Sequence, residues 1–336
     1  MPRIVEGLQH IPGVHCCSTA LRDVMAYYGH LFSEALCFGL GNGLGFIYMK
    51  DDRAQVPRFF TGRSLFLVPP FLTNLGYPFF WRPRQDFPLK DIQAAIDANL
   101  PVLALTDLYY LPYYKSSTHF SSHCILIGGY DDNSRVFFVG DTERDGWQEL
   151  AYGDLQAAMG SPHGPWPMEN YFTPVANLEV KGLTGPIAKA LKGNAESLLE
   201  SRYPLALDAL RVLGQEVESW PRELPDRWAW CARFGYQAIE RRGTGGGNFR
   251  KLYAEYLTEA CGFLPWLCAM NAPERMGQAA KLWSEAAELL KEASEEESED
   301  RLRGAAELFR DIYAIEKGLW EEIQKKLCNQ KGEPCA

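Results

Sequence analysis

The chain has 336 residues, 46% of them hydrophobic and 23% charged, which is the composition of a globular protein with one large core or two smaller ones. Its net charge of −9 argues against a general nucleic-acid binder, which requires clustered positive charge. Nine cysteines without regular spacing, and no hydrophobic leader, favour a reduced, cytoplasmic setting over a disulfide framework. No apolar run approaches the roughly 20 residues of a membrane-spanning helix, so we expect no membrane partner.

The first half of the chain predicts an α+β domain over residues 1–183. Helices are expected at Thr19–Tyr28 and Leu89–Ala98, because each segment places its apolar residues on one face. Apolar runs bounded by turn residues predict three buried strands, at Leu100–Thr106, Cys124–Tyr130 and Arg135–Val139. The polar segment Asp131–Ser134 is expected to form the hairpin turn between the last two strands.

After Gly185 the pattern changes to helical spacing, which predicts an all-α domain over residues 184–336. Prolines separate its expected helices, which are placed at about 187–200, 203–219, 226–241, 248–268, 273–293 and 300–327. The acidic stretch Glu292–Asp300 is expected to be a solvated connection between the last two helices.

Two adjacent cysteines stand at the start of the first helix. At 100° per residue, Cys17 falls within the apolar arc that contains Leu21 and Val24, so we expect it to pack in the core. Cys16 lies roughly 100° away, at the helix N-terminus, where the helix dipole favours the reactive thiolate. We therefore predict that Cys16 is a nucleophile facing a cleft. The alternative is that both cysteines are structural.

A nucleophilic thiol requires an imidazole within reach and a third group that orients the ring. His123 stands at the entrance of a buried strand, and Asp141 closes the neighbouring strand. Hairpin geometry should bring both residues to the same edge of the sheet, so we predict a Cys16, His123, Asp141 triad. The alternatives are a half-buried strand histidine and an Asx cap of the following loop. His119 is a rival base, but it lies in a loop with nothing to fix it.

Weaker roles are assigned around this triad. The backbone N–H of Cys16 and the side chain of Gln9 are candidate oxyanion donors, and His15 is expected just behind the reacting groups. A zinc site made from His15 and nearby cysteines is not expected, because neighbouring residues rarely converge on one ion. The tyrosines at positions 109, 110, 113 and 114 either line an acceptor pocket or hold the two domains together.

Two glycine-rich loops are candidate substrate sites. Glycines at every second position of Gly39–Gly45 let the backbone approach a ligand, although a tight helix-to-strand turn explains them equally well. The loop Gly243–Gly247 precedes a helix expected near residue 248, and such an arrangement suits a phosphopantetheine phosphate, a substrate carboxylate or an acidic carrier protein. An N-cap turn with solvated arginines is the alternative. The predicted substrate contacts are Gly41, Gly43, Tyr48, Gly245, Gly246, Asn248 and Arg250.

These motifs carry a resemblance to known families. The run from Cys16 to Gly29, together with His123 and Asp141, resembles the catalytic groups of the papain-like bacteriocin-leader peptidases, although Gln9 lies one residue further from the cysteine than their oxyanion glutamine. The segments His15–Leu21 and Ser33–Tyr48 resemble the N-terminal domain of the butirosin-biosynthesis protein H family. Gly243–Tyr253 resembles the helical domain that often follows it.

The resemblance implies a papain-like catalytic domain followed by a helical domain that covers the cleft. It also implies an acyltransferase of antibiotic biosynthesis, which moves an acyl group from an acyl carrier protein or a small thioester donor to a small amine acceptor. No metal or cofactor is expected, apart from the phosphopantetheine arm of a donor carrier protein. A cysteine peptidase or amidase with the same triad, and a non-catalytic scaffold that binds a carrier protein, are the alternatives.

Overall fold

The computed structural model describes residues 2–163 and 167–331, which fold into two compact units. The first unit contains the chain up to Cys37 and then Pro78–Lys181, and the second contains Phe38–Tyr77 and the chain from Gly182 onward. The expected division into residues 1–183 and 184–336 therefore needs correction. The segment Phe38–Tyr77 folds with the helical part of the chain, because its two strands pack on helices there.

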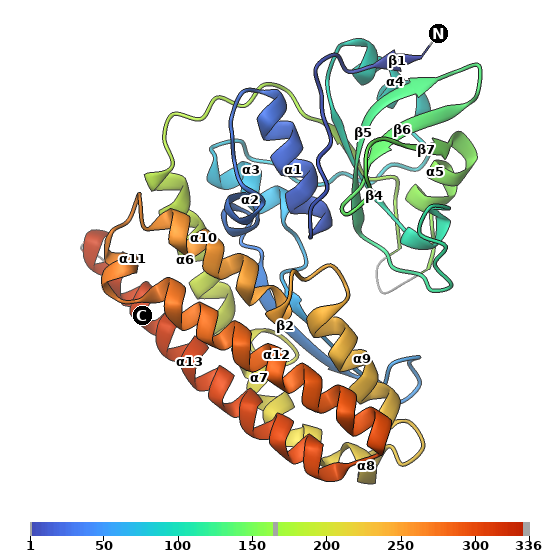
Figure 1. Ribbon diagram of the computed structural model, residues 1–336. Coiled ribbons are helices and arrows are strands. Elements are labelled where there is room, and N and C mark those ends of the chain that lie inside the picture. The colour runs from blue at the N-terminus through green and yellow to red at the C-terminus, as the bar shows by residue number, and fades with distance from the viewer. Residues whose placement is uncertain (1, 164–166, 332–336) are drawn as a thin grey trace. The chain divides into compact units, whose positions relative to one another are not determined.

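The first unit is built on an antiparallel sheet with the strand order β7-β6-β5-β4-β8, and β1 also pairs with β5 (Figure 1). Its strands are β1 (Arg3–Ile4), β4 (Val102–Thr106), β5 (His123–Asp131), β6 (Val136–Gly140), β7 (Gln148–Ala151) and β8 (Phe172–Pro174). The three strands that the apolar runs predicted are β4, β5 and β6. Their central residues are almost all buried, which explains why they have no alternating polar face.

The helices of this unit are α1 (Cys16–Tyr27), α4 (Leu89–Asp97) and α5 (Tyr152–Met159), with a short 3₁₀ turn at Leu108–Tyr110. Helix α1 packs against β5, and α5 packs against β4 and β7. In the register of the sheet, Thr106 at the end of β4 lies opposite His123 at the start of β5. Gly140 ends β6 opposite Leu126, so the end of β4, the start of β5 and the end of β6 meet at one edge.

The second unit combines a β-hairpin with helices. The hairpin strands are β2 (Leu44–Lys50) and β3 (Arg58–Arg63), and they pack on α7 and α9 respectively. The helices are α2 (Glu34–Leu40, which begins in the first unit), α3 (Val68–Asn74), α6 (Thr184–Glu200), α7 (Ala206–Glu216), α8 (Trp220–Glu223), α9 (Trp228–Glu240), α10 (Arg250–Ala260), α11 (Trp266–Ala269), α12 (Ala272–Glu296) and α13 (Glu299–Lys331). Sequence analysis did not predict the hairpin strands. The long helices α12 and α13 lie side by side (Figure 1).

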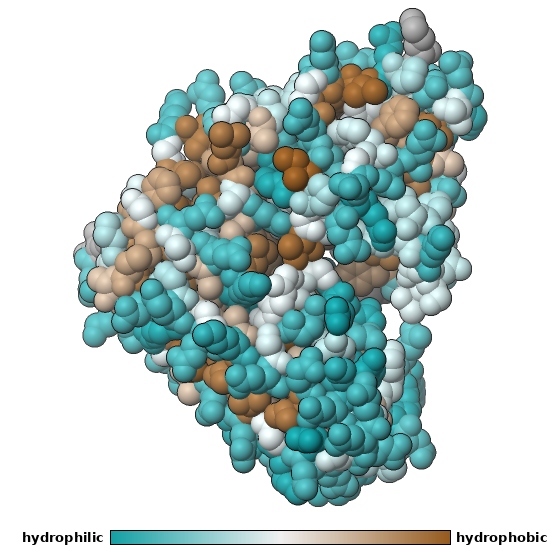
Figure 2. All heavy atoms as spheres, in the orientation of Figure 1, coloured by the Kyte–Doolittle hydropathy of each residue, from teal (hydrophilic) through white to brown (hydrophobic). Residues whose placement is uncertain are grey.

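The acidic stretch Glu292–Asp300 is mostly helical rather than a connection. Helix α12 continues to Glu296, and α13 begins at Glu299. The charges are compensated locally, since the Arg301 guanidinium lies 3.1 Å from the Glu292 carboxylate. The surface at this end of the unit, where α8 also lies, is mostly hydrophilic (Figure 2).

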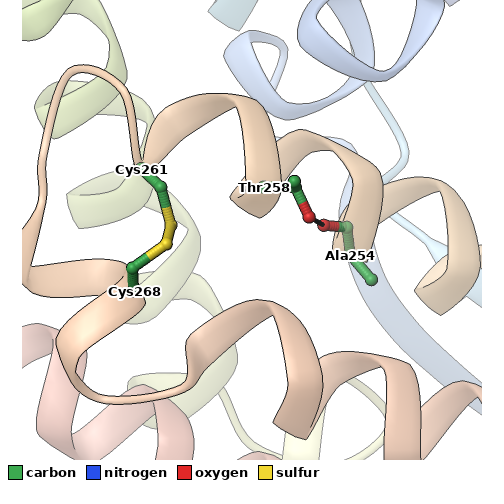
Figure 3. Close-up of a disulfide and its surroundings, with 4 residues drawn as sticks. All are labelled: Ala254, Thr258, Cys261 and Cys268. Carbon is green, nitrogen blue, oxygen red and sulfur yellow. Dashed lines mark hydrogen bonds between the residues drawn. A yellow bond between two sulfur atoms is a disulfide. The ribbon is translucent and has the colours of Figure 1, made fainter.

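A disulfide joins Cys261 and Cys268 (Figure 3), whereas sequence analysis favoured a reduced setting over a disulfide framework. The bridge links the residue after α10 to α11 across a loop containing Pro265. Sequence analysis missed it because the spacing of seven residues matches no common framework. The predicted single helix over 248–268 is interrupted at this loop, so the disulfide spans the break.

A buried ion pair anchors the start of α10. The Arg250 guanidinium donates two hydrogen bonds to the Glu316 carboxylate, at 2.8 and 2.9 Å, and both side chains are fully buried. The Trp283 indole N–H also donates to Glu316, at 3.0 Å. Arg250 donates further to the backbone carbonyl of Gly62, at 2.8 Å. One guanidinium therefore ties together α10, α13 and the hairpin strand β3.

We predict that Arg250→Met lowers the free energy of unfolding by about 3–5 kcal/mol, because it leaves the buried Glu316 carboxylate without its partner. The measurement is urea denaturation. Arg233→Met is the matched control, since its ion pair with Glu295 is exposed and should contribute less than about 1 kcal/mol. Equal losses in the two variants would contradict this assignment.

Candidate active site

The N-terminus of α1 is held by two side chains. His15 is the N-cap, and its Nδ1 accepts the Ser18 backbone N–H at 3.4 Å. The Glu34 carboxylate accepts the backbone N–H groups of Val14, at 3.0 Å, and His15, at 2.7 Å. Cys16 is the first helical residue, so its own N–H has no acceptor within the helix. The first turn is thus fixed by groups outside it, and His15 caps the helix that begins with Cys16.

Both adjacent cysteines are buried. Cys16 is 8% exposed and Cys17 is 6% exposed, so the expected contrast between an open and a packed cysteine is absent. They differ in their contacts instead. The Cys16 thiol makes hydrogen bonds with the His123 imidazole and with the Cys17 thiol. The contact with His123 joins the start of α1 to the start of β5.

Asp141 holds the other side of the His123 ring. Its Oδ1 accepts a hydrogen bond from His123 Nε2 at 2.8 Å, which leaves Nδ1 for the Cys16 sulfur. Three hydroxyl groups also donate to the same carboxylate, from Tyr113 at 2.8 Å, Tyr114 at 3.1 Å and Thr142 at 2.9 Å. Asp141 is only 1% exposed. A buried carboxylate with four donors is fixed in position, and so is the imidazole that it bonds.

The surroundings shift the proton affinities of all three groups. The hydrogen bond with Cys17, followed by burial, raises the pKa of the Cys16 thiol, and the contact with His123 only partly opposes this. Burial would lower the pKa of His123, but the Asp141 carboxylate outweighs it and raises the pKa to about 10. Burial would raise the pKa of Asp141, whereas His123 and the hydroxyl donors hold it below the usual value. The raised pKa of the Cys16 thiol favours its neutral form and the raised pKa of His123 favours the imidazolium, so neither direction favours the expected thiolate.

A second histidine–carboxylate pair lies behind Asp141. His10 Nδ1 is 2.7 Å from the Asp23 carboxylate, and its Nε2 is 3.0 Å from the carbonyl of Arg144. The His10 side chain is almost fully buried, and a Cβ built on Gly140 would lie 2.7 Å from its ring. Glycine at position 140 therefore lets the His10 ring pack directly under the turn that carries Asp141.

The predicted accessory residues of the first unit are placed differently from expectation. Gln9 is exposed on the segment before α1, while the neighbouring His10 points inward. The hydroxyl groups of Tyr113 and Tyr114 donate hydrogen bonds to Asp141, a role that was not among the two arrangements considered for them. Their position could not be found from sequence spacing, since the loop between β4 and β5 has no periodic pattern.

Three of the predicted substrate contacts, Gly41, Gly43 and Tyr48, are buried in the second unit. Tyr48 is fully buried and accepts a hydrogen bond from the Trp220 indole at 3.1 Å. Gly41 and Gly43 belong to the turn between α2 and β2, and a Cβ at either position would collide with neighbouring atoms. The helix-to-strand turn that was the alternative explanation is thus the observed one.

Two backbone N–H groups of the loop Gly243–Gly247 are bonded within the chain, whereas both polar atoms of the Asn248 side chain are buried without a partner among the described residues. The Gly247 N–H donates to the Glu240 carboxylate at 3.0 Å, and the Gly246 N–H donates to the Thr244 hydroxyl at 3.1 Å. Asn248 is fully buried, in a left-handed backbone conformation. Arg250 is bonded to Glu316 and a Glu240 carboxylate already lies at the loop, so neither favours an anion here, and the predicted contacts Gly245, Gly246 and Asn248 stay a prediction.

The first unit is therefore an α+β structure whose buried cysteine, histidine and aspartate are joined by hydrogen bonds at one sheet edge. The family model described as butirosin biosynthesis protein H, N-terminal, matches residues 15–142. A model described as a domain of unknown function, DUF4872, matches residues 153–323. The chain belongs to the family of proteins that combine these two regions. No curated protein matches the chain.

The length and hydropathy of a helix determine whether it can span a membrane. Among the helices of the described residues, none is long and apolar enough to cross a bilayer.

We predict opposite effects of two neighbouring substitutions on the alkylation of Cys16 by iodoacetamide. His123→Gln should slow the reaction, because the imidazole contact lowers the thiol pKa, and each unit of increase reduces the thiolate fraction about tenfold. Cys17→Ala should accelerate it, because the hydrogen bond with Cys17 is the main cause of the raised pKa. Peptide mapping after timed labelling measures both rates. Rates that change in the same direction would contradict the assignment.

Proposed function

We propose that the chain is an acyltransferase that carries the acyl group on Cys16 as a thioester. The observation that carries this proposal is the continuous hydrogen-bonded series from the Cys16 thiol through the His123 imidazole to the Asp141 carboxylate. A nucleophile, a base and a group that orients the base are the three parts that covalent acyl chemistry requires. The position of the thiol at a helix N-terminus opposite a sheet edge supports a papain-like description of the first unit.

The proposed reaction has two stages. The Cys16 sulfur attacks the carbonyl carbon of a donor thioester, the bond from that carbon to the donor sulfur breaks, and the thiol proton passes through His123 to the departing thiol. An amine then attacks the acyl-Cys16 thioester, a carbon–nitrogen bond forms and the bond to the Cys16 sulfur breaks. The proton released by the amine returns to the sulfur through His123. The unbonded N–H of Cys16 is a donor for the developing oxyanion.

The choice of donor and acceptor rests on the family. Proteins named for butirosin biosynthesis belong to secondary metabolism, where acyl groups travel as thioesters. We therefore propose an acyl carrier protein or a small thioester as donor and a small amine as acceptor. The phosphopantetheine arm of such a carrier would be the only prosthetic group that takes part in the reaction.

The test is intact-protein mass spectrometry after incubation with an acyl N-acetylcysteamine thioester. The wild-type chain should gain one acyl mass, and Cys16→Ser should not form the labile thioester adduct. Cys17→Ser is the matched control and should still be labelled. Labelling that survives in Cys16→Ala would overturn the proposal. An adduct that decays in water at the same rate with and without added amines would indicate a hydrolase instead.

We also predict that acylation becomes faster as the pH rises above neutrality. The raised pKa values of Cys16 and His123 both favour the protonated forms. One proton must therefore leave before His123 can accept another from the thiol. The acylation rate should then level off near pH 10, close to the pKa of His123. Asp141→Asn removes the charge that raises this pKa, so the plateau should begin at lower pH. Acylation rates measured over a pH series for both proteins check this. A profile in Asp141→Asn that superimposes on the wild type would contradict it.

A further inference from the structure

A third histidine–carboxylate pair, His119 with Asp107, lies in the first unit. His119 Nδ1 lies 2.6 Å from Oδ2 of Asp107, and this carboxylate is fully buried. Asp107 also accepts the Ser161 hydroxyl at 2.7 Å and the backbone N–H groups of Tyr109 and Phe120. The expectation that nothing fixes His119 was therefore wrong. Sequence analysis missed the pair because the two residues are 12 positions apart in an irregular loop.

The charge state of Asp107 determines the proton position on His119. Burial would raise the pKa of Asp107, but the hydrogen bonds from Ser161, His119 and the two backbone groups hold it below the usual value. An ionised carboxylate only accepts hydrogen bonds, so Nδ1–H of His119 donates to Asp107. In the neutral ring the lone pair is then on Nε2, which has no hydrogen-bond partner in the described part of the chain.

His119 differs from His123 in its exposure. The His119 side chain is 30% exposed, whereas that of His123 is 6% exposed. The His119 ring is held between the rings of Tyr109 and His163, with centroids 4.2 Å from each. A ring fixed on both faces and at one nitrogen, with its other nitrogen unpartnered, can meet a molecule arriving from solvent.

The His119–Asp107 pair and the His123–Asp141 pair lie at the same edge of the sheet. Asp107 directly follows Thr106, which is the residue opposite His123 in the register of β4 and β5, and the Thr106 hydroxyl donates to the His123 carbonyl at 2.9 Å. His119 precedes His123 by four residues. Between these two histidines, the Ser121 hydroxyl is buried without a partner among the described residues. The segment from His119 to His123 therefore offers a polar group for a ligand atom.

The proposed transfer needs more than one proton acceptor. An alkylamine resembles a lysine side chain and is an ammonium ion at neutral pH, which cannot attack a carbonyl carbon. It must lose one proton before the attack and a second one as the amide forms. His123 is buried against Cys16 and serves the second transfer. The first transfer must occur where the amine arrives.

We propose that His119, positioned by Asp107, is the base that removes the first proton from the incoming ammonium group. In this step the proton moves from the amine nitrogen to Nε2 of His119, the ammonium becomes a neutral amine, and His119 becomes an imidazolium beside the Asp107 carboxylate. The neutral amine then attacks the acyl-Cys16 thioester. This inference rests on the proposed acyl transfer and assigns the acceptor side of that site.

The experiment separates the acceptor step from acylation. Wild type and His119→Ala are first loaded with acyl N-acetylcysteamine and checked by intact mass, and both should be acylated. Each acyl-enzyme is then mixed with propylamine, which is protonated at neutral pH, or with hydroxylamine, which is largely neutral. Removing a general base should slow the reaction with propylamine by about 100-fold or more. The reaction with hydroxylamine should stay within twofold of wild type.

Two further measurements exclude a merely structural role. Ser117→Ala is the matched control, because this exposed residue belongs to the same loop and has no hydrogen bond with His119 or Asp107 in the described structure, and its propylamine reaction should remain near that of wild type. Added imidazole should restore the propylamine reaction of His119→Ala. Equal slowing with both nucleophiles, no slowing, or a wild-type acyl-enzyme that propylamine does not consume would each overturn the inference. Failure of the wild type to become acylated would instead overturn the proposed function itself.

Discussion

The Asp141 carboxylate is the group on which the arrangement of the first unit depends. A charged group with 1% exposure is stable only when its lone pairs are satisfied, and here one imidazole and three hydroxyl groups do so. Those donors come from β5, from the loop after β4 and from the residue after Asp141. One buried charge thereby fixes a loop that has no regular secondary structure of its own.

The same carboxylate determines the chemistry of the neighbouring groups. Because Asp141 favours the protonated imidazole, the charge on His123 partly offsets the effects of burial on the Cys16 thiol. The helix dipole alone does not produce a thiolate at this position, since Cys17 and burial act in the opposite direction. The reactivity of the cysteine is consequently a property of the whole network rather than of the helix terminus.

Much of the local structure could be predicted from the sequence, because it depends on residues close together in the chain. The strands β4, β5 and β6 and the hairpin between the last two follow from apolar runs and a polar turn, and the proximity of His123 and Asp141 follows from that hairpin. The hairpin strands β2 and β3 were not predictable in this way. Their apolar residues pack on helices more than 140 positions later, and no local pattern contains that information.

The glycine-rich segments show where motif interpretation fails. A loop such as Gly243–Gly247 before a helix is compatible with ligand binding and with tight packing, and only the tertiary partners distinguish the two. Here Glu240 and Glu316 lie far from each other in sequence, yet they occupy the N–H group and the guanidinium that a ligand would need. Likewise, the pairing of Asp107 with His119 could not be predicted from the sequence, because composition does not distinguish a buried carboxylate from an exposed one.

The contact between Gly140 and His10 constrains how the family can diverge. No Cβ fits at position 140 while an imidazole lies beneath it, and that imidazole is bonded to Asp23 in α1. A homologous chain with a side chain at position 140 would therefore need a smaller residue than histidine at position 10, so we expect these two positions to vary together. Asp23 would keep its second partner, Arg22, in such a chain.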